Sequence, residues 1–445
     1  MLLLASSSPS VAPNPTAFTI PLINKHPSSD PIKTLKSLAS ASLTRAHHLK
    51  RPKSKPPLTE TQVFSESYRE YSISLSFGTP PQTIPFILDT GSSLVWFPCT
   101  SQYNCIFCGI DPSKIPSFIP ELSSSSKFIG CQNPKCAWIS NPNALSRCQD
   151  CKSSKNCSQT CPPYTYLYGS GGTYGRLLSD TLNFPEKLFT DFIVGCSNFS
   201  INIPAGIAGF GRTPLSLPSQ LGLSKFSYCL ISQRFNDTSE SSDLVLYRGS
   251  SSDAKTPGLS HTRFRKNPAF PDFYYVDLLK ITVGGESVSI PYKYLLSEGK
   301  NNGNGGTIVD SGTSFTVMAT PIFDAVATAF EAEMGNFSRA SADVVASTGL
   351  NLCFYITGLK LEKIKVPKLT FEFKGGAKLK LPVVNYFAPA VVGNSSLGCL
   401  TIVTDGALVP VGPAIILGNT QQQNFYVEFD LENERFGFRK QNCNK

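Results

Sequence analysis

The sequence carries one short pattern twice, in two copies separated by roughly half the chain. A largely apolar run is followed by Asp, a small hydroxyl residue, Gly and two more hydroxyl residues at 86–93 (Phe-Ile-Leu-Asp-Thr-Gly-Ser-Ser) and at 307–314 (Thr-Ile-Val-Asp-Ser-Gly-Thr-Ser). Each copy is followed, more than a hundred residues later, by two apolar residues and Gly, at 207–209 and 416–418. The simplest explanation is a duplicated lobe, with one Asp-containing loop in each copy.

Short β-prone runs separated by Gly, Pro and Ser make up most of the chain after residue 70. Residues 71–77 alternate strictly between apolar and polar side chains and lead into a Gly-Thr-Pro-Pro turn. Regular short strands with turn signals between them predict an all-β protein. The 445 residues exceed one typical domain of about 100–200 residues, so we expect two β lobes. Further predicted strands are 83–89, 192–194, 244–246, 274–279, 370–373 and 425–429, and the clearest helix is 321–331.

The positive charge of the chain is concentrated in an N-terminal arm. Residues 25–65 hold eight Lys and Arg against two acidic residues, which accounts for +6 of the net charge of +9. This distribution disfavours nucleic acid as a partner, because the remaining chain carries only +3. Within the arm, Leu35, Leu38, Ala39 and Leu43 have helix-like spacing and precede a Pro- and Lys-rich linker. Such a basic helix could be a solvated tail, but beside a carboxylate-based site a cationic arm would act as a mask.

These features divide the chain into four parts. We expect a signal-like segment at 1–24, a basic prosegment and linker at 25–68, an N-terminal β lobe at 69–255, and a C-terminal β lobe at 256–445. The signal-like segment is weak, because its apolar start is shorter than the usual apolar region of about 7–15 residues. No apolar run reaches the roughly 18 residues needed to cross a bilayer, so no membrane span is expected.

Nine of the fourteen cysteines lie within 99–161, a Cys-rich insert of the first lobe. Zinc is an alternative, because Cys105/Cys108 and Cys148/Cys151 are C-x-x-C pairs, but 39 residues separate the pairs and other cysteines lie among them. Disulfides in an oxidising compartment explain the cluster better, and five glycosylation sequons fit a secretory route. The disulfide candidates are Cys99, Cys105, Cys108, Cys131, Cys136, Cys148, Cys151, Cys157, Cys161, Cys196, Cys229, Cys353, Cys399 and Cys443, and the sequon residues are Asn156, Asn198, Asn236, Asn336 and Asn394.

Each Asp loop contains residues that would position its carboxylate. Gly91 and Gly312 permit a tight turn and a close approach of two backbones. Ser92 and Thr313, three residues after each Asp, would hydrogen-bond the outer carboxylate oxygens. A single such motif is more often an ordinary turn, since Asp, Gly and Ser all favour turns. The second copy, with its own apolar lead-in and downstream Gly element, reverses that preference.

If the two loops meet at a pseudo-two-fold axis, Asp89 and Asp310 face each other across one water molecule. Two carboxylates so close cannot both ionise easily and therefore share a proton. The ionised partner would accept a proton from the water, and the protonated partner would donate to the scissile carbonyl oxygen. The pair titrates as a unit, so neither residue is assigned as the acid.

The chain resembles the pepsin-like aspartic proteases and, within that family, the plant nepenthesin-type group. This resemblance implies a bilobal pepsin-like fold of two pseudo-symmetric β lobes with a cleft between them. It also implies that Tyr168 and Gly169 belong to a flap supported by Trp96, and that Cys353 and Cys399 form a disulfide. The matching segments are 89–93, 310–314, Trp96, 168–171, 417–420, 436–438 and the Cys-rich insert; the flap departs from the group in reading Gly-Ser-Gly-Gly.

We therefore expect an aspartic endopeptidase, made as a zymogen and active at acidic pH, with peptides or proteins as substrates. The alternative is a catalytically silent binding protein on the same scaffold, similar to plant relatives that inhibit glycosidases. No cofactor or metal is expected, and three of the four histidines lie in the arm, which argues against a Ser-His-Asp triad. We expect a secreted monomer of the cell wall or apoplast, with the vacuole as the alternative destination.

Overall fold

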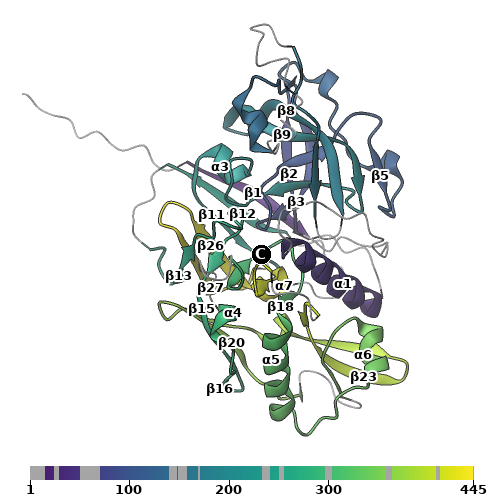
Figure 1. The fold of residues 1–445 in the computed structure, drawn as a ribbon, viewed down its shortest axis with the longest axis vertical. Coiled ribbons are helices and arrows are strands. Elements are labelled where there is room, and N and C mark those ends of the chain that lie inside the picture. The colour runs from purple at the N-terminus through teal and green to yellow at the C-terminus, as the bar shows by residue number, and fades with distance from the viewer. Residues whose placement is uncertain are drawn as a thin grey trace, which may run out of the picture.

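A computed structural model provides the fold. It describes residues 16–24, 30–50, 71–139, 148, 158–168, 171–232, 241–249, 255–295, 303–356, 363–406 and 411–443. Figure 1 shows two β-rich lobes, one above the other, with a long helix lying across their junction. The predicted bilobal β architecture is confirmed. Within the described residues, no helix is both long and apolar enough to cross a membrane.

The N-terminal lobe is built around the long hairpin of β8 and β9, which pair from Gly172↔Ile201 to Phe184↔Lys187. The predicted strand 71–77 is β2, and it pairs with β3 to form the sheet that leads into the first Asp loop. The elements of this lobe are β2 (Tyr71–Phe77), β3 (Gln82–Asp89), β4 (Trp96–Pro98), β5 (Asn104–Ile106), β6 (Lys127–Phe128), β7 (Tyr164–Leu167), β8 (Gly172–Phe184), β9 (Lys187–Ile201), β10 (Gly206–Gly209) and α3 (Leu217–Leu221), with 3-10 turns at Pro112–Lys114, Pro120–Leu122 and Pro134–Trp138.

The C-terminal lobe holds the second Asp loop and most of the helices. The predicted helix 321–331 is α5, which begins at Thr320 and ends at Glu333. The elements are β15 (Leu278–Val283), β16 (Glu286–Ser287), α4 (Tyr292–Leu295), β17 (Thr307–Val309), β18 (Thr316–Met318), α5 (Thr320–Glu333), α6 (Ala342–Thr348), β19 (Cys353–Tyr355), β20 (Leu369–Phe373), β21 (Lys378–Lys380), β22 (Phe387–Val392), β23 (Ser395–Leu400), β24 (Ile402–Thr404), β25 (Ile415–Leu417) and α7 (Asn419–Gln422), with a 3-10 turn at Val383–Asn385.

A continuous series of paired strands joins the two lobes. It runs through β2, β1, β12, β11, β26, β27, β13, β14 and β17, so it links the first lobe to the strand that ends just before Asp310. Buried aromatic rings fill one side of it, and the Phe226 and Phe429 rings are stacked with centroids 4.5 Å apart. The strands not yet bounded are β1 (Thr16–Asn24), β11 (Leu223–Cys229), β12 (Ser241–Arg248), β13 (Ser260–Arg265), β14 (Tyr275–Val276), β26 (Phe425–Asp430) and β27 (Arg435–Lys440).

Strand β1 occupies a stretch that the sequence analysis placed in the signal-like segment. It pairs antiparallel with β12 over eight residue pairs and with the start of β2. Phe18, Ile20 and Leu22 alternate along it and are buried in the main hydrophobic core. This alternation is the period-2 pattern of a half-buried strand, which explains why the segment takes part in the sheet.

The helix predicted from the basic arm is α1 (Pro31–Leu49), the dark purple helix of Figure 1. The Asp30 side chain caps its first turn by accepting hydrogen bonds from the N–H groups of Ile32 and Lys33, at 2.9 and 3.2 Å. Its apolar side packs on the C-terminal lobe against α6, β18, β22 and β24. The buried residues of α1 are Thr34, Leu35, Leu38, Ala39, Ser42, Arg45, Ala46 and Leu49.

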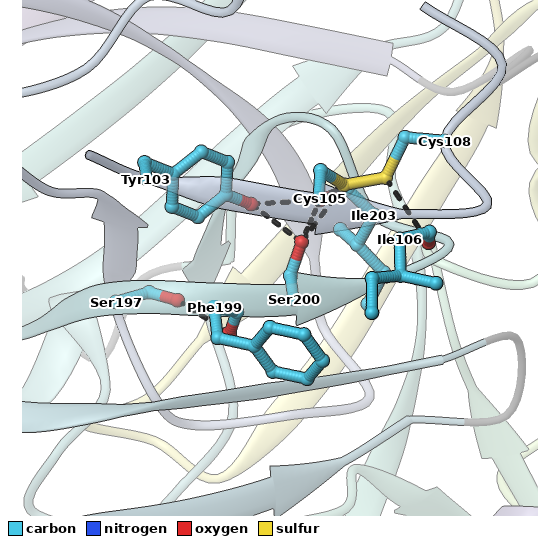
Figure 2. The surroundings of a disulfide bond; sticks show 8 residues. All are labelled: Tyr103, Cys105, Ile106, Cys108, Ser197, Phe199, Ser200 and Ile203. Carbon is cyan, nitrogen blue, oxygen red and sulfur yellow. Dashed lines mark hydrogen bonds between the residues drawn. A yellow bond between two sulfur atoms is a disulfide. The ribbon is translucent and has the colours of Figure 1, made fainter. Parts of the chain in front are cut away.

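Six disulfides lie among the described residues. Cys105 is joined to Cys108, so the first C-x-x-C pair closes on itself, and Figure 2 shows it beside Tyr103 and Ser200. Cys148 is joined to Cys131 instead of to its C-x-x-C partner. Cys151 and Cys157 lie outside the described residues. The other pairs are Cys99–Cys196, Cys136–Cys161, Cys229–Cys443 and Cys353–Cys399.

Candidate active site

The two Asp loops occupy equivalent places in the two lobes. Strand β3 lies parallel to β10, with Asp89 beside Gly209, and β17 lies parallel to β25, with Val309 beside Leu417. The downstream Gly elements of the sequence repeat are thus the partner strands of the Asp strands. Backbone hydrogen bonds continue each pairing past the strand end, from Phe210 N–H to the carbonyl of Asp89 and from Asp310 N–H to that of Leu417, at 2.7 and 3.1 Å.

Reciprocal hydrogen bonds hold the two loops together. The Thr90 N–H donates to the Ser311 hydroxyl at 3.0 Å, and the Ser311 N–H donates to the Thr90 hydroxyl at 2.9 Å. The hydroxyls in turn donate to the carbonyls of Val309 and Leu88, which lie on the opposite strands. All four bonds are buried, so they are strong constraints on the distance between the two loops. Sequence analysis noted these small hydroxyl residues but assigned them no role.

The carboxylates of Asp89 and Asp310 have nearly equivalent surroundings. In each, Oδ1 accepts a hydrogen bond from the N–H two residues later, in Gly91 or Gly312, at 2.9 Å. The side chain three residues later donates to Oδ2 in both, from Ser92 at 2.5 Å and from Thr313 at 2.6 Å. The two aspartates are 1% and 0% exposed.

The glycines of the Asp loops lie against the opposite carboxylate. A Cβ atom at Gly91 would lie 2.6 Å from Oδ1 of Asp310, and one at Gly312 would lie 2.5 Å from Oδ1 of Asp89. Heavy atoms cannot approach so closely, so a side chain at either position would push the two aspartates apart. The requirement for glycine therefore comes from the spacing of the pair.

The Arg45 side chain from α1 is inserted between the two carboxylates. Its Nη2 donates to Oδ1 of Asp89 at 2.5 Å and to Oδ1 of Asp310 at 3.1 Å, and its Nε donates to Oδ2 of Asp310 at 2.7 Å. The arginine side chain is itself only 10% exposed. One residue of the basic arm thus neutralises both acidic loops and occupies the space between them. Sequence analysis predicted the cationic arm as a mask but did not identify this residue.

The two carboxyl groups are electrostatically unequal. Burial raises the pKa of Asp89, with a further rise from the Asp310 carboxylate, and the opposing effects of Arg45, Ser92 and Gly91 do not cancel it. Burial also raises the pKa of Asp310, but Arg45, which is both its nearest charge and its hydrogen-bond donor, lowers that pKa below its ordinary value with help from Thr313.

Further contacts hold α1 to the C-terminal lobe near the Asp loops. The Ser42 hydroxyl accepts a hydrogen bond from the Phe315 N–H at 2.8 Å, immediately after the second Asp loop. At the end of the helix, Lys50 Nζ lies 2.5 Å from Oδ2 of Asp405, and the two side chains are 6% and 5% exposed. His47 Nε2 lies 3.1 Å from the Asp405 carbonyl oxygen.

The predicted flap residue Tyr168 lies over Trp96. The indole Nε1 donates to the Tyr168 hydroxyl at 2.9 Å, and both side chains are buried. Tyr166, two residues earlier, has its ring centroid 5.0 Å from that of Tyr168. Burial, followed by the negative charge of Asp272 and Asp89, raises the pKa of Tyr166, so both phenols stay protonated and can donate hydrogen bonds. Gly169 lies outside the described residues.

We expect Tyr168→Phe to weaken the flap without unfolding the protein. The substitution leaves the buried Nε1–H of Trp96 without its acceptor, which costs about 1–3 kcal/mol of unfolding free energy. Urea denaturation of the variant and of the wild type measures this loss. Tyr355→Phe, whose hydroxyl receives only a 3.5 Å contact from Ser341 N–H, is the matched control and should keep the wild-type stability.

Three of the five predicted sequon asparagines can be located. Asn198, Asn336 and Asn394 are exposed, and so are accessible to glycosylation, whereas Asn156 and Asn236 lie outside the described residues.

Two family models match the chain. They are described as xylanase inhibitor N-terminal and xylanase inhibitor C-terminal, and they match residues 71–246 and 273–440.

Curated relatives at 30% identity or more are named as aspartic proteases. A probable aspartyl protease of Arabidopsis thaliana is 35% identical and covers 84% of this chain and 82% of its own length. The aspartic proteinases nepenthesin-1 and nepenthesin-2 of Nepenthes gracilis are 33% and 32% identical. They cover 87% and 86% of this chain, and 81% and 80% of their own lengths.

Solved structures share the fold at lower identity. The crystal structure of edgp superposes with a TM-score of 0.63 at 18% identity, covering 97% of this chain and 96% of its own. Basic 7S globulin from soybean superposes with a TM-score of 0.61 at 17% identity, covering 96% of this chain and 97% of its own. At these identities the likeness shows the fold alone.

Proposed function

Because this chain belongs to the nepenthesin-type group of the pepsin-like aspartic protease family, we propose that it is an aspartic endopeptidase that cleaves proteins at acidic pH. The observation that carries the proposal is the pair of buried carboxylates, Asp89 and Asp310, each held by an N–H and a hydroxyl of its own loop. Relatives named as aspartic proteases support the same reaction.

The proposed mechanism uses the two carboxylates as a single acid–base pair. Once Arg45 has left, a water molecule takes its place between the inner oxygens. The ionised carboxylate accepts a proton from that water as it attacks the scissile carbonyl carbon, and the protonated carboxylate donates to the carbonyl oxygen. The proton taken from the water then passes to the leaving nitrogen as the carbon–nitrogen bond breaks, and the hydroxyl formed from the carbonyl oxygen returns its proton to the carboxylate that supplied it. The loop N–H and hydroxyl donors keep both carboxylates aligned for these transfers.

We further propose that the chain is made as a zymogen and that α1 is its inhibitory element. Arg45 lies where the attacking water must bind, and α1 covers the adjoining surface of the C-terminal lobe. An extended peptide substrate cannot reach the carboxylates while this helix is in place.

Acid should release the helix, because Arg45 lowers the pKa of the Asp310 carboxyl group while the helix is bound. In the arm-bound form burial raises the pKa of Asp310, but Arg45 outweighs it and lowers this pKa below its ordinary value, so it rises towards that value when the arm leaves. The stabilisation that Arg45 gives the arm-bound form through Asp310 is complete above the arm-free pKa. It is lost as the pH falls through the arm-bound pKa, because release of the arm takes up a proton.

The disulfides support a secreted protein. Six pairs lie within the described residues, and disulfides persist in oxidising compartments. We therefore place the protein in the secretory route, with the cell wall or apoplast as its destination and the vacuole as the alternative.

A second candidate function is inhibition of a glycosidase, because the matching family models are described as xylanase inhibitor domains. If the chain is such an inhibitor, the two Asp loops would be retained as part of the fold but would not catalyse hydrolysis.

One assay separates the two functions. The chain is acid-treated, removal of the arm is checked by mass spectrometry, and it is incubated with an unfolded protein substrate and, separately, with a xylanase and its polysaccharide. Proteolysis blocked by a statine-type mimic of the tetrahedral intermediate supports the endopeptidase. Absence of proteolysis from an intact, arm-free protein would reject it, and inhibition of the xylanase would then favour the alternative.

A further inference from the structure

We propose that Asp405 is a specificity-determining residue that binds a basic side chain of the substrate. This inference rests on the proposed endopeptidase function and extends it to substrate choice. In the arm-bound form, the site is filled by Lys50, whose ammonium group stands in for that of a substrate lysine.

The C-terminal lobe holds the Asp405 carboxylate in a fixed orientation. Its Oδ1 accepts hydrogen bonds from the N–H and the hydroxyl of Thr320, at 3.0 and 3.1 Å, and its own N–H donates to the Met318 carbonyl at 2.9 Å. These groups belong to the lobe and remain when the arm leaves. Oδ2 points at the arm and receives Lys50 Nζ at 2.5 Å. The lobe therefore presents one oriented carboxylate oxygen to whatever occupies the place of α1.

The place that Lys50 occupies is a confined one. Gly412 lies so close to the arm that a Cβ atom there would be 2.9 Å from the Lys50 Cα and 3.0 Å from the Leu49 carbonyl oxygen. Phe270 packs beside the same glycine, and its Cζ would be 3.5 Å from such a Cβ. Burial, the largest effect on Lys50, lowers the pKa of its ammonium group, while Asp405 opposes that change. The pair is thus enclosed by protein, where an ion pair is screened less than at a surface.

Asp405 and the two Asp loops are contacted by the same arm. Arg45 lies in α1 and marks the reacting centre, and Lys50 is the residue that caps the end of this helix. A substrate that takes the place of the arm can therefore bring a basic side chain to Asp405 while its backbone reaches the two carboxylates. We expect that side chain to lie at a fixed position relative to the scissile bond.

Departure of α1 leaves this carboxylate without its cation. A substrate ammonium or guanidinium group that restores the pair gains binding energy, because the bound peptide again excludes water from the carboxylate. A hydrogen bond to a charged group contributes about 1.5–3 kcal/mol, which corresponds to about ten- to hundredfold in kcat/KM. An uncharged side chain of the same length would gain only its apolar contacts.

The test scans one lysine through an otherwise constant octapeptide. Each lysine peptide is paired with a norleucine peptide, which keeps the length of the side chain but lacks its charge. The acid-treated, arm-free chain, its Asp405→Asn variant and an Asp277→Asn control are assayed for kcat/KM on every pair. The asparagine in Asp405→Asn keeps an oxygen as the acceptor for Thr320, so the fold should survive. Asp277 pairs with Arg265 instead of with the arm, so its variant controls for loss of a carboxylate.

The wild type and Asp277→Asn should prefer lysine to norleucine by about ten- to hundredfold at one or two neighbouring positions. In Asp405→Asn that ratio should fall to near one, while kcat/KM for the norleucine peptides stays within about twofold of the wild type. Cleavage without a lysine preference, or a preference that survives in Asp405→Asn, would overturn the inference and leave the endopeptidase function standing. Failure to cleave any peptide would overturn both.

Discussion

Asp89→Asn and Asp310→Asn should each abolish hydrolysis of peptide bonds, lowering kcat by about 10⁴-fold or more. An amide has nearly the shape of a carboxylate, and its oxygen can still accept the N–H of the loop glycine, while its NH2 group can donate to the loop hydroxyl. However, at either position it can neither take a proton from water nor share one with the remaining carboxyl group. Since each aspartate is buried and forms part of one charged pair, both variants should fail to the same degree.

The measurement is cleavage of an unfolded protein by acid-treated wild type and variants. Arm removal is verified in each sample, because Arg45 loses a charged partner in either variant. Asp277→Asn, which removes a carboxylate paired with Arg265 elsewhere, is the control and should retain wild-type activity. Circular dichroism and denaturation check that the variants are folded. A folded, arm-free Asp89→Asn protein that keeps more than a few percent of the wild-type rate would contradict the two-carboxylate mechanism.

Arg45→Met should convert a latent chain into one that is active without acid treatment. Arg45 is only 8% exposed. Methionine keeps much of the apolar packing of its side chain but supplies no charge. Two buried carboxylates then lack their cation. Removing one partner of a buried ion pair costs about 3–5 kcal/mol. If this free energy is lost from arm binding, the ratio of arm-bound to arm-free chain should fall by at least about a hundredfold.

The latency of Arg45→Met should also become less dependent on pH. In the proposed zymogen mechanism, acid releases the arm because Arg45 holds the pKa of Asp310 below its ordinary value only while the arm is bound. Without Arg45 that difference disappears, so the pH profile for release should flatten between the arm-bound and arm-free pKa values. Activity of the untreated chain, followed from neutral to acidic pH, measures both effects. Lys36→Met, an exposed position of α1, is the control, and equal latency in Arg45→Met and wild type would reject the role of Arg45.

The fold is largely predictable because its signals are periodic. Strict alternation marks 71–77, and the repeated Asp loops with their downstream Gly elements predict two equivalent lobes. Strand β1 escapes prediction because its alternation at Phe18, Ile20 and Leu22 follows a polar, Pro-rich start that is typical of no strand. Its partner β12 is more than two hundred residues away, and such a pairing leaves no local mark.

The candidate site is predictable in its two aspartates but not in the residues that face them. Eight basic residues lie within 25–65, and composition alone does not distinguish Arg45 from the others. Which basic residue reaches the aspartates depends on the side of α1 from which it projects and on where the helix docks, and both are tertiary properties. Thr90 and Ser311 are visible as the second residue of each loop, but their mutual hydrogen bonds require the two loops to meet. Asp405 carries no sequence signal at all.

The strand that precedes α1 makes this helix, the inhibitory element that we propose, a tethered ligand. Strand β1 ends at Asn24 and α1 begins at Pro31, so only six residues connect the helix to a strand that is paired within the sheet joining the lobes. A short tether holds its ligand at an effective concentration of about a millimolar or more. A cut in the linker after α1 would therefore leave the helix able to rebind the C-terminal lobe beside the Asp loops. Lasting activity requires that the connection before α1 be cut as well, or that β1 leave its sheet.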